Sequence, residues 1–457
     1  MADKKVQGTP VFHEIGSTGL RESGGFVYEE FIKKLQWPRA GDIYQEMSSN
    51  DPVITAVLFC CRMLIQRVTW HVKPASDAQA DLDCAEFVES CMNDMSETWT
   101  DFIDEVISYF SYGYSYHEIV YKKRQGDSKQ GAKRSQYNDG RIGWRKLPGR
   151  RQTTLTNWDI ADDGGIRGVY QLNDSSYVYL PIERGLLFRT ANTHNNPEGI
   201  SFLRGAYRPW YFKKHIEEVE GIGIERDLAG LPVIMTPEGL DLSNTADETC
   251  REARLKAESL VSSIRRDRND GVVLGFGWDL KLLSTGGSRQ FDTNAIINRY
   301  DQRIAITLLA DIIMLGADKV GSFALASVKQ SLLATALDAQ LYSICEVLNR
   351  YAIPRLIALN SFPGITGTPS FTCTSVVSPD LNALGGFISN LAGANMPLFP
   401  DLDLENYLRD AANLPRTEDA AECRTVAQEN NGAPGNPSNG TDAAPTNSDK
   451  GDLTDAK

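Results

Sequence analysis

The residues that could do chemistry are few, and their spacing matches no familiar catalytic motif. The stretch "GDSKQGAK" at 126–133 is only loosely like a phosphate-binding loop, because Ala132 separates the second glycine from the lysine and no Ser or Thr follows. "HEIG" at His13 and "HEIV" at His117 begin like zinc-protease helices, but neither has a second His four positions after the first. We therefore expect neither a nucleotide-hydrolysing loop nor a zinc site, and no cofactor.

Two pairs of carboxylates could in principle hold magnesium for nuclease work. Asp81 and Asp83, and Asp401 and Asp403, are each two positions apart. A solvated or helix-capping role fits such isolated pairs better. The sequence also has no GxSxG elbow and no GxGxxG fingerprint, and its five histidines are not grouped. An active site assembled from distant residues stays open as an alternative.

Composition sets further limits on function. The chain has 457 residues and a formal charge of -13, so it has no overall basic field that would attract nucleic acid. Its eight cysteines form no CxxC pair, which indicates buried thiols and a reducing compartment. The central apolar run at 304–315 is too short to cross a bilayer, which takes roughly 20 residues, and we expect neither a membrane span nor a signal peptide.

The first half of the chain predicts an α+β unit that closes before Asn195. Asp51 and Pro52 suit the start of a helix that ends near Arg67, and two more helices are expected over about 78–95 and 97–111. "YGYSYHEIVYKK" at 112–123 alternates like a half-buried strand. The polar segment 125–138 is expected to be an exposed hairpin tip between strands.

The second half predicts two long helices around a small α/β insertion. Ser201 suits a cap for the first helix, and Pro209 either kinks it or marks its first turn. Its apolar stripe comprises Leu203, Tyr207, Trp210, Tyr211, Val219 and Ile222. Lys213 and Lys214, with several glutamates, are expected on its exposed face.

The insertion and the later helices complete this outline. In the insertion we expect a strand "LPVIM", a helix at about 248–266, and strands at 271–276 and 278–283. A second long helix is expected over 288–315, and after the break "GADKVGSF" helical periodicity resumes from Leu325 to Tyr351. Two short helices follow, and the Asn-, Gly- and Pro-rich tail beyond Arg416 predicts disorder.

The order of these parts resembles the portal proteins of tailed bacteriophages, specifically the Mu-like portal family. The resemblance covers about residues 40–415 and is sharpest in the blocks at 196–234 and 308–360, "NPEGISFLRGAYRPWYFKKHIEEVEGIGIERDLAGLPVI" and "LLADIIMLGADKVGSFALASVKQSLLATALDAQLYSICEVLNRYAIPRLIALN". It implies an α+β portal fold assembled as a ring. The implied parts are an N-terminal arm (1–44), a wing (45–199), a first stem helix (200–230), a clip (231–287), a second stem helix (288–315), a tunnel loop (316–323), a long helix that closes the wing (324–375), a crown (376–415) and a disordered tail (416–457).

The resemblance also implies a function. It implies a ring, commonly of twelve subunits, at one capsid vertex of the virion, through which double-stranded DNA is packaged and ejected. The implied partners are the large terminase subunit, then a head–tail adaptor protein, and the major capsid and scaffold proteins, with assembly in the host cytoplasm and no membrane. Such a protein is not an enzyme. The alternatives are a phage DNA-processing enzyme, such as a nuclease or a packaging ATPase component, and a scaffold without a channel.

Two sets of residues follow from the resemblance as candidate sites. The tunnel loop would project toward DNA, with Lys319 and Lys329 as sparse cations near the constriction. The residues of this set are Gly316, Asp318, Lys319, Gly321, Ser322, Phe323 and Lys329. In the clip, Arg265, Arg266 and Arg268 could pair with carboxylates of a motor or adaptor protein. The alternative for these arginines is a solvated helix end whose cations complement the helix dipole.

Overall fold

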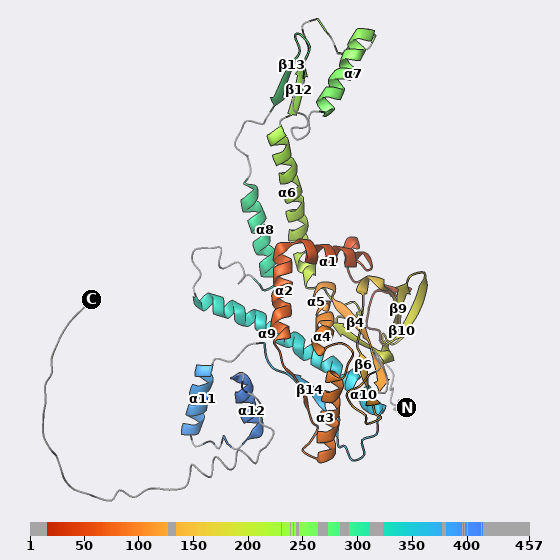
Figure 1. The fold of residues 1–457 in the computed structure, drawn as a ribbon, viewed down its shortest axis with the longest axis vertical. Coiled ribbons are helices and arrows are strands. Elements are labelled where there is room, and N and C mark those ends of the chain that lie inside the picture. Colours follow the sequence, from red (N-terminus) through yellow and green to blue (C-terminus); the bar gives the residue numbers. More distant parts are fainter. Residues whose placement is uncertain are drawn as a thin grey trace, which may run out of the picture. The chain divides into compact units, whose positions relative to one another are not determined.

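The computed structural model describes two compact units, residues 1–377 and 378–457 (Figure 1). The described residues are 16–126, 134–229, 231–263 except 238, 241, 244 and 245, 273–283, 292–310, 323–376, and 381–414 except 395, 397, 400 and 413. Within these residues no helix combines the length and apolar character that a bilayer crossing requires.

Two early helices of the first unit, over Pro52–Gln66 and Trp99–Ile107, begin at residues whose side chains cap them. Asp51 Oδ1 accepts hydrogen bonds from the amides of Val53 and Ile54 at 3.0 and 3.1 Å, and Pro52 occupies the first helical position. This confirms the helix predicted to end near Arg67. The helices of the α+β part are α1 (Arg39–Asn50), α2 (Pro52–Gln66), α3 (Gln79–Asn93), α4 (Trp99–Ile107) and α5 (Tyr109–Tyr112).

Small antiparallel sheets accompany these helices. Their strand orders are β10-β9-β8, β11-β4-β7, β5-β6, β14-β3 and β1-β2. The strands are β1 (Glu22–Ser23), β2 (Phe26–Val27), β3 (Trp70–Lys73), β4 (Tyr114–Glu118), β5 (Val120–Lys123), β6 (Ile142–Lys146), β7 (Gly149–Arg150), β8 (Leu155–Ile160), β9 (Ile166–Asn173), β10 (Ser176–Pro181), β11 (Gly185–Arg189) and β14 (Ser370–Cys373).

The prediction of one half-buried strand at 112–123 was wrong. The segment forms β4 and β5, which pair with different partners. Tyr114, Ser115, Tyr116 and His117 of β4 are all buried. The reason is that both faces of β4 are covered: Ser115 Oγ donates to the carbonyl of Val106 and His117 packs against Phe102, both of α4, on one face. On the other face Tyr114 and Tyr116 lie in the core cluster with Trp158. The side chains of β4 therefore do not alternate between core and solvent.

The main core is closed by a helix from far along the chain. Helix α9 (Phe323–Val347) continues through a π-helical segment (Leu348–Ala352) into α10 (Ile353–Ala358). Leu337, Leu341 and Ile344 of α9 are buried in the same cluster as Val57 and Ile65 of α2. Apolar residues at three-and-four spacing on α9 thus pack into the core of the α+β part.

The N-terminal segment packs against its own chain. The expected boundary between arm and wing at residue 44 falls inside α1. Ala40, Tyr44 and Met47 of α1 form a second core cluster with Leu203 and Trp210. The described part of the arm is thus ordered within one chain, because these apolar side chains are buried there.

The first long helix and the insertion largely follow the sequence. Helix α6 (Leu203–Ala229) contains Pro209 in its interior, which excludes Pro209 as the first turn. The insertion pairs β12 (Leu231–Met235) with β13 (Asp279–Leu283) and contains α7 (Glu248–Ser263). The strand expected at 271–276 was wrong for its described part, since residues 273–276 are not extended in a sheet and Val273 and Phe276 are fully exposed.

The second long helix is shorter than expected. Helix α8 (Thr293–Thr307) ends eight residues before the predicted end at 315. Leu309 has a φ of 56°, a left-handed conformation that no α-helix contains. The apolar composition of 304–315 had suggested a continuous helix, but backbone geometry at Leu309 ends it.

The second unit contains two helices, as the sequence predicted. They are α11 (Leu381–Gly393) and α12 (Leu402–Ala411), and the Oδ1 of Asp401 accepts a hydrogen bond from the amide of Leu404 at the start of α12. The tail predicted to be disordered, 416–457, lies outside the described residues.

Candidate functional site: the paired helices α6 and α8

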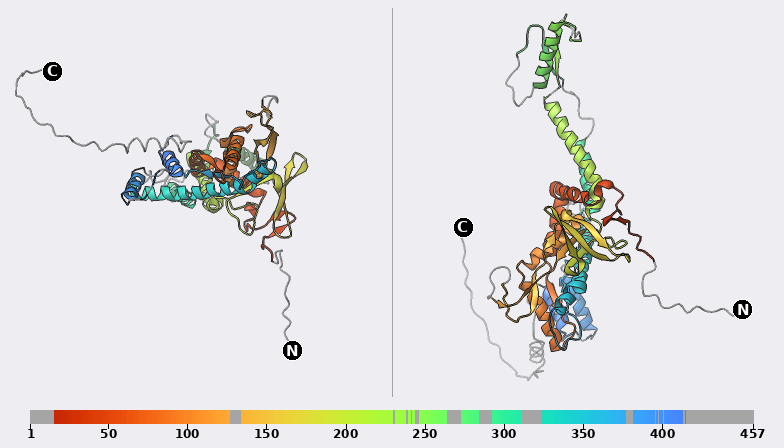
Figure 2. Two further views of the ribbon diagram at one scale, coloured as in Figure 1. Left: turned by 90° about the horizontal axis from the view of Figure 1, so that it is seen from below. Right: turned by 90° about the vertical axis from the view of Figure 1, so that its right-hand side faces the viewer.

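Helices α6 and α8 lie side by side and run antiparallel (Figures 1 and 2). A Cβ at Gly205 would lie 2.7 Å from Thr307 Cγ2, the rings of Phe212 and Tyr300 stack with centroids 6.4 Å apart, and Thr293 donates to Glu220. Residue numbers fall on α8 as they rise on α6. The two helices therefore contact one another over most of the length of α8.

A buried ion cluster fixes this pair to the α+β part. Lys213 Nζ on α6 lies 2.9 Å from Asp51 Oδ2 and 2.6 Å from Asp301 Oδ1 on α8, and its side chain is 3% exposed. Burial alone would lower the pKa of Lys213, but the contacts that its ammonium makes to the carboxylates of Asp301 and Asp51 outweigh burial and raise the pKa. The lysine stays charged and joins α6, α8 and the N-cap of α2.

This cluster corrects the expectation that Lys213 lies on the exposed face of the helix. Its neighbour Lys214 does lie near the surface, paired with Glu46, and both of these side chains are more than a third exposed. The sequence could not separate the two lysines, because the acidic partners Asp51 and Asp301 are 162 and 88 positions away from Lys213 in the chain.

The segment before α6 is tied down by backbone contacts. Ser201 Oγ accepts a hydrogen bond from the amide of Leu203, the first helical residue, as expected of a capping side chain. A Cβ at Gly199 would lie 2.2 Å from the carbonyl oxygen of Gly113, and both glycines have positive φ. The start of α6 is thus fixed against the end of α5.

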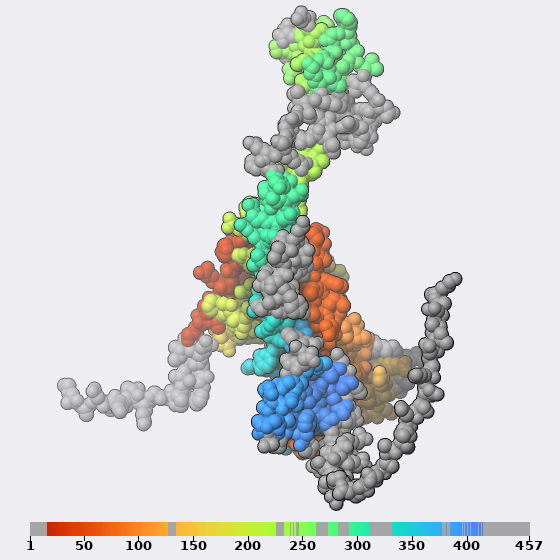
Figure 3. All heavy atoms as spheres, turned by 90° about the vertical axis from the view of Figure 1, so that its left-hand side faces the viewer, coloured from red at the N-terminus to blue at the C-terminus, as the bar shows by residue number. Residues whose placement is uncertain are grey.

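The apolar stripe of α6 is buried only in its first half. Leu203, Tyr207 and Trp210 are in the core, whereas Val219 and Ile222 are 65% and 50% exposed. On α8, Ile306 is 58% exposed, and the blue-green surface of α8 is open to solvent in the view of Figure 3. The single chain therefore leaves apolar surface of the helix pair uncovered, which marks it as a candidate interaction surface.

The comparisons with known proteins decide the family. The family model described as "Portal protein of Mu bacteriophage" matches residues 41–411. The chain belongs to this portal family. Among solved structures, it is similar to a chain of the virion of a native gene transfer agent particle, with 12% identity, a TM-score of 0.47, and coverage of 83% of this chain and 95% of that one.

Two further structures are similar to the portal chain at low identity. One is a chain of the neck of the native gene transfer agent particle computed with C12 symmetry, with 12% identity, a TM-score of 0.45, and coverage of 83% of this chain and 95% of that one. The other is an HK97 family phage portal protein from Corynebacterium diphtheriae, with 12% identity, a TM-score of 0.35, and coverage of 71% of this chain and 95% of that one.

The candidate residues taken from the family resemblance are largely outside the described part of the portal chain. Gly316, Asp318, Lys319, Gly321 and Ser322 fall outside it, as do Arg265, Arg266 and Arg268 of the insertion. Phe323 and Lys329 are in the first turns of α9, and their side chains are not described.

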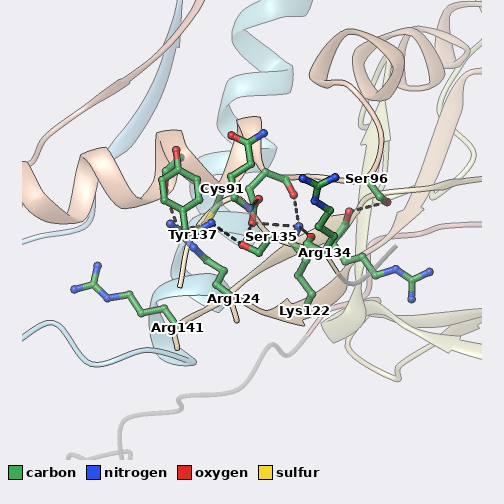
Figure 4. Close-up of polar contacts among 12 residues, drawn as sticks. Cys91, Ser96, Lys122, Arg124, Arg134, Ser135, Tyr137 and Arg141 are labelled. Atoms are coloured by element: carbon green, nitrogen blue, oxygen red, sulfur yellow. Dashed lines mark hydrogen bonds and ion pairs between the residues drawn. The ribbon is translucent and has the colours of Figure 1, made fainter. Parts of the chain in front are cut away.

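The portal chain also has a buried polar cluster under the β5–β6 hairpin that the sequence did not indicate. Lys122 Nζ lies 3.1 Å from Asp94 Oδ2, with both side chains 3% exposed, and Ser135 Oγ donates to the same carboxylate at 2.6 Å. Arg124 stacks on the Tyr137 ring at 3.9 Å (Figure 4). The segment 125–138 was expected to be an exposed hairpin tip. This expectation was wrong at Ser135, whose side chain is buried against Asp94.

Asp81 and Asp83, one of the two carboxylate pairs considered for magnesium, make structural hydrogen bonds in the portal chain. Asp81 Oδ1 accepts a hydrogen bond from the amide of Thr366 at 3.0 Å, and Asp83 Oδ1 accepts one from Gln79. Hydrogen bonds from Ser76 and Thr366 lower the pKa of Asp81. Within the described residues, no three His, Cys, Asp or Glu side chains form a group that could hold a metal ion.

Proposed function

We propose that the chain forms a ring-shaped channel, of twelve subunits as the family resemblance implies, at one capsid vertex of a phage virion. Double-stranded DNA would pass through it during packaging and ejection. The single observation that carries this proposal is membership of the portal family over residues 41–411. The uncovered apolar surface of α6 and α8 supports it, because such surface suits contact with further copies.

The charge of the chain suits a conduit. Each phosphate that a fixed Lys or Arg neutralises adds a salt-dependent contribution to binding, so a strongly basic channel would hold its cargo. A channel works when occupancy is weak at many equivalent sites. The chain has a net charge of -13, and in our proposal only a few cations, Lys319 and Lys329, lie near the constriction of the channel. Such a channel would bind the DNA weakly.

The partners are proposed from the same family role. Residues 231–287 would dock the large terminase subunit and later a head–tail adaptor protein, with Arg265, Arg266 and Arg268 pairing with carboxylates. The major capsid and scaffold proteins would contact the ring at the vertex. Replacement of all three arginines by Ala should weaken terminase or adaptor binding while rings still form. Unchanged binding would reject this role.

The channel itself can be tested on purified protein. Mass by light scattering, combined with negative-stain images, should show a closed ring with a central opening. A solid or open assembly would contradict the proposal and favour a scaffold. Mg²⁺-dependent DNA cleavage or ATP turnover by the purified chain would instead favour a DNA-processing enzyme. The portal family is a structural family, and no observation on the described residues favours the enzyme.

A further inference from the structure

Two cysteines from different elements face one another in the first unit. Cys345 is in the second half of α9 and Cys373 is the last residue of β14, and their Sγ atoms are 3.6 Å apart. Cys345 is buried and Cys373 is half-buried, and both are free thiols. A disulfide requires an S–S distance of about 2.05 Å, so small side-chain rotations would be enough to bring the sulfurs into bonding distance.

The surroundings hold the two thiols in place. Asn349 of the π-helical segment receives a hydrogen bond from the amide of Phe371 at 2.6 Å and donates to its carbonyl at 3.1 Å. On the other side, Asp338 of α9 accepts from Ser375 Oγ at 2.6 Å and from the amide of Val376 at 2.7 Å. Strand β14 is thus fixed to α9 before and after Cys373, which keeps the sulfurs opposed.

A small molecule can reach this pair. Both cysteines line a groove of about 770 Å³ between α9 and β14, whose lining also includes Tyr342, Glu346 and Arg350. The groove is partly open to solvent, and Cys373 is the more exposed of the two cysteines. Cys373 is therefore the thiol that an oxidant in the groove reaches more readily.

The pKa values of the two thiols are shifted in opposite directions. The S–H of Cys345 donates to Cys373, which lowers the pKa of Cys373 and raises that of Cys345, whose burial acts in the same direction. Thiolates are the attacking species in thiol–disulfide exchange. Cys373 is therefore the first nucleophile and Cys345 the resolving thiol.

We propose that Cys345 and Cys373 are an oxidisable dithiol that a low-molecular-weight disulfide such as oxidised glutathione converts into an intrachain disulfide. The Cys373 thiolate attacks one sulfur of glutathione disulfide, forms a mixed disulfide and releases one glutathione thiolate. Cys345 then loses its proton and attacks the Cys373 sulfur, which releases the second glutathione. The protein loses two electrons and two protons, and two glutathione molecules are formed.

The bond would join α9 directly to β14 and close a loop between positions 28 residues apart. Because a cross-link of this length restricts the unfolded chain, it stabilises the folded unit. Strand β14 is the last strand of the first unit among the described residues. This inference does not depend on the proposed channel function.

The experiment treats the reduced full-length chain with oxidised glutathione and maps thiols by mass spectrometry of non-reduced peptides. We expect a Cys345–Cys373 cross-linked peptide to appear before Cys60, the other half-buried cysteine of the first unit, is modified. The Cys345→Ser variant should instead accumulate a stable glutathione adduct on Cys373. The matched control, Cys60→Ser, should form the cross-link at the rate of the unaltered chain.

Thermal unfolding gives a second readout. Oxidation should raise the Tm of the unaltered chain by about 3–6 °C and leave that of Cys345→Ser unchanged. Two results on the unaltered chain would overturn the proposal without any variant having to fold. One is a glutathione adduct on Cys373 that persists without resolution, and the other is modification of Cys60 ahead of the pair.

Discussion

Lys213 and Asp301 form an ion pair of 2.6 Å between α6 and α8, at the point where both helices meet the N-cap of α2. Asp51 completes the cluster, so one buried cation neutralises two carboxylates from two other helices. Removal of the cation leaves both carboxylates without their counter-charge in a place with little water. The following expectations start from this cluster.

The Lys213→Met substitution should destabilise the folded chain by about 3–5 kcal/mol, because it strands buried charges while keeping the volume of the side chain. Equilibrium denaturation followed by circular dichroism measures the change. The matched control is Lys214→Met on the next position, whose pair with Glu46 is near the surface and should cost less than about 1 kcal/mol. Equal losses of unfolding free energy for the two variants would show that the buried Lys213 cluster stabilises the fold no more than the surface pair of Lys214 does.

Asp51 has two roles that substitution can separate. Asn at this position keeps an oxygen for the amides of Val53 and Ile54 but removes the charge opposite Lys213, whereas Ala removes both. We expect Asp51→Ala to cost about 1 kcal/mol more than Asp51→Asn in the same denaturation assay. A double-mutant cycle with Lys213→Met should show coupling for the charge and none for the cap. Identical stabilities of the Ala and Asn variants would argue against capping.

His117 should make stability fall in mild acid. Burial between Phe102 and Phe188 lowers the pKa of His117 from 6.5 to about 4, and its Nδ1 lies 2.9 Å from the carbonyl oxygen of Leu147, to which it donates. Because the folded pKa is the lower one, this contribution to stability is fully present above pH 6.5. It is lost as the pH falls from 6.5 to 4, up to about 3 kcal/mol.

The His117→Gln variant tests this origin. Gln carries no titrating group and keeps a donor, so the slope of stability against pH should flatten between pH 6.5 and 4. The matched substitution His215→Gln, at a half-exposed histidine beside Glu218, controls for the loss of an imidazole as such. A slope that persists in His117→Gln would assign the acid sensitivity to other groups.

The exposed half of α6 should be needed for assembly and dispensable for folding. Ile222 is 50% exposed in the single chain, so Ile222→Glu should keep the circular dichroism spectrum and the Tm. If this face contacts further copies, the buried charge would reduce the fraction of rings by at least tenfold in light scattering. Glu218→Gln on the same helix is the control. Normal ring yield for Ile222→Glu would place the subunit contact elsewhere.

Lys319→Glu tests the proposed tunnel loop. We expect the variant to assemble rings normally and to package less DNA, since a cation near the constriction would be replaced by an anion that repels phosphate. The yield of packaged particles in a phage complementation assay measures this, with Lys319→Arg as the control that keeps the charge. A Lys319→Glu phage that packages at the normal yield would remove this assignment.

Local signals in the sequence predicted the elements that depend on neighbouring residues. Asp51 and Pro52 predicted the start of α2, and the apolar periodicity after Leu203 and Leu325 predicted α6 and α9. What could not be predicted depends on distant partners. The burial of Lys213 requires Asp301, the full burial of β4 requires α4 on one face and the cluster around Trp158 on the other, and the Cys345–Cys373 contact joins a helix to a strand.

In the candidate site, too, some features could be predicted from the sequence and others could not. The family and the paired helices could be predicted, because long periodic segments in a fixed order are a strong signal. The end of α8 could not, since the left-handed backbone at Leu309 leaves no trace in an apolar run such as 304–315. Of the site residues proposed from the resemblance, the tunnel-loop and clip side chains stay predictions.

The contact between Gly113 and Gly199 has a consequence for how the protein can change over generations. Main chain touches main chain there, and even a methyl group at Gly199 would collide with the Gly113 carbonyl. At this point the start of α6 is held by backbone atoms, at a spacing that admits no side chain at Gly199. A substitution at either glycine would therefore have to push two stretches of main chain apart, a change that no adjustment of neighbouring side chains can absorb.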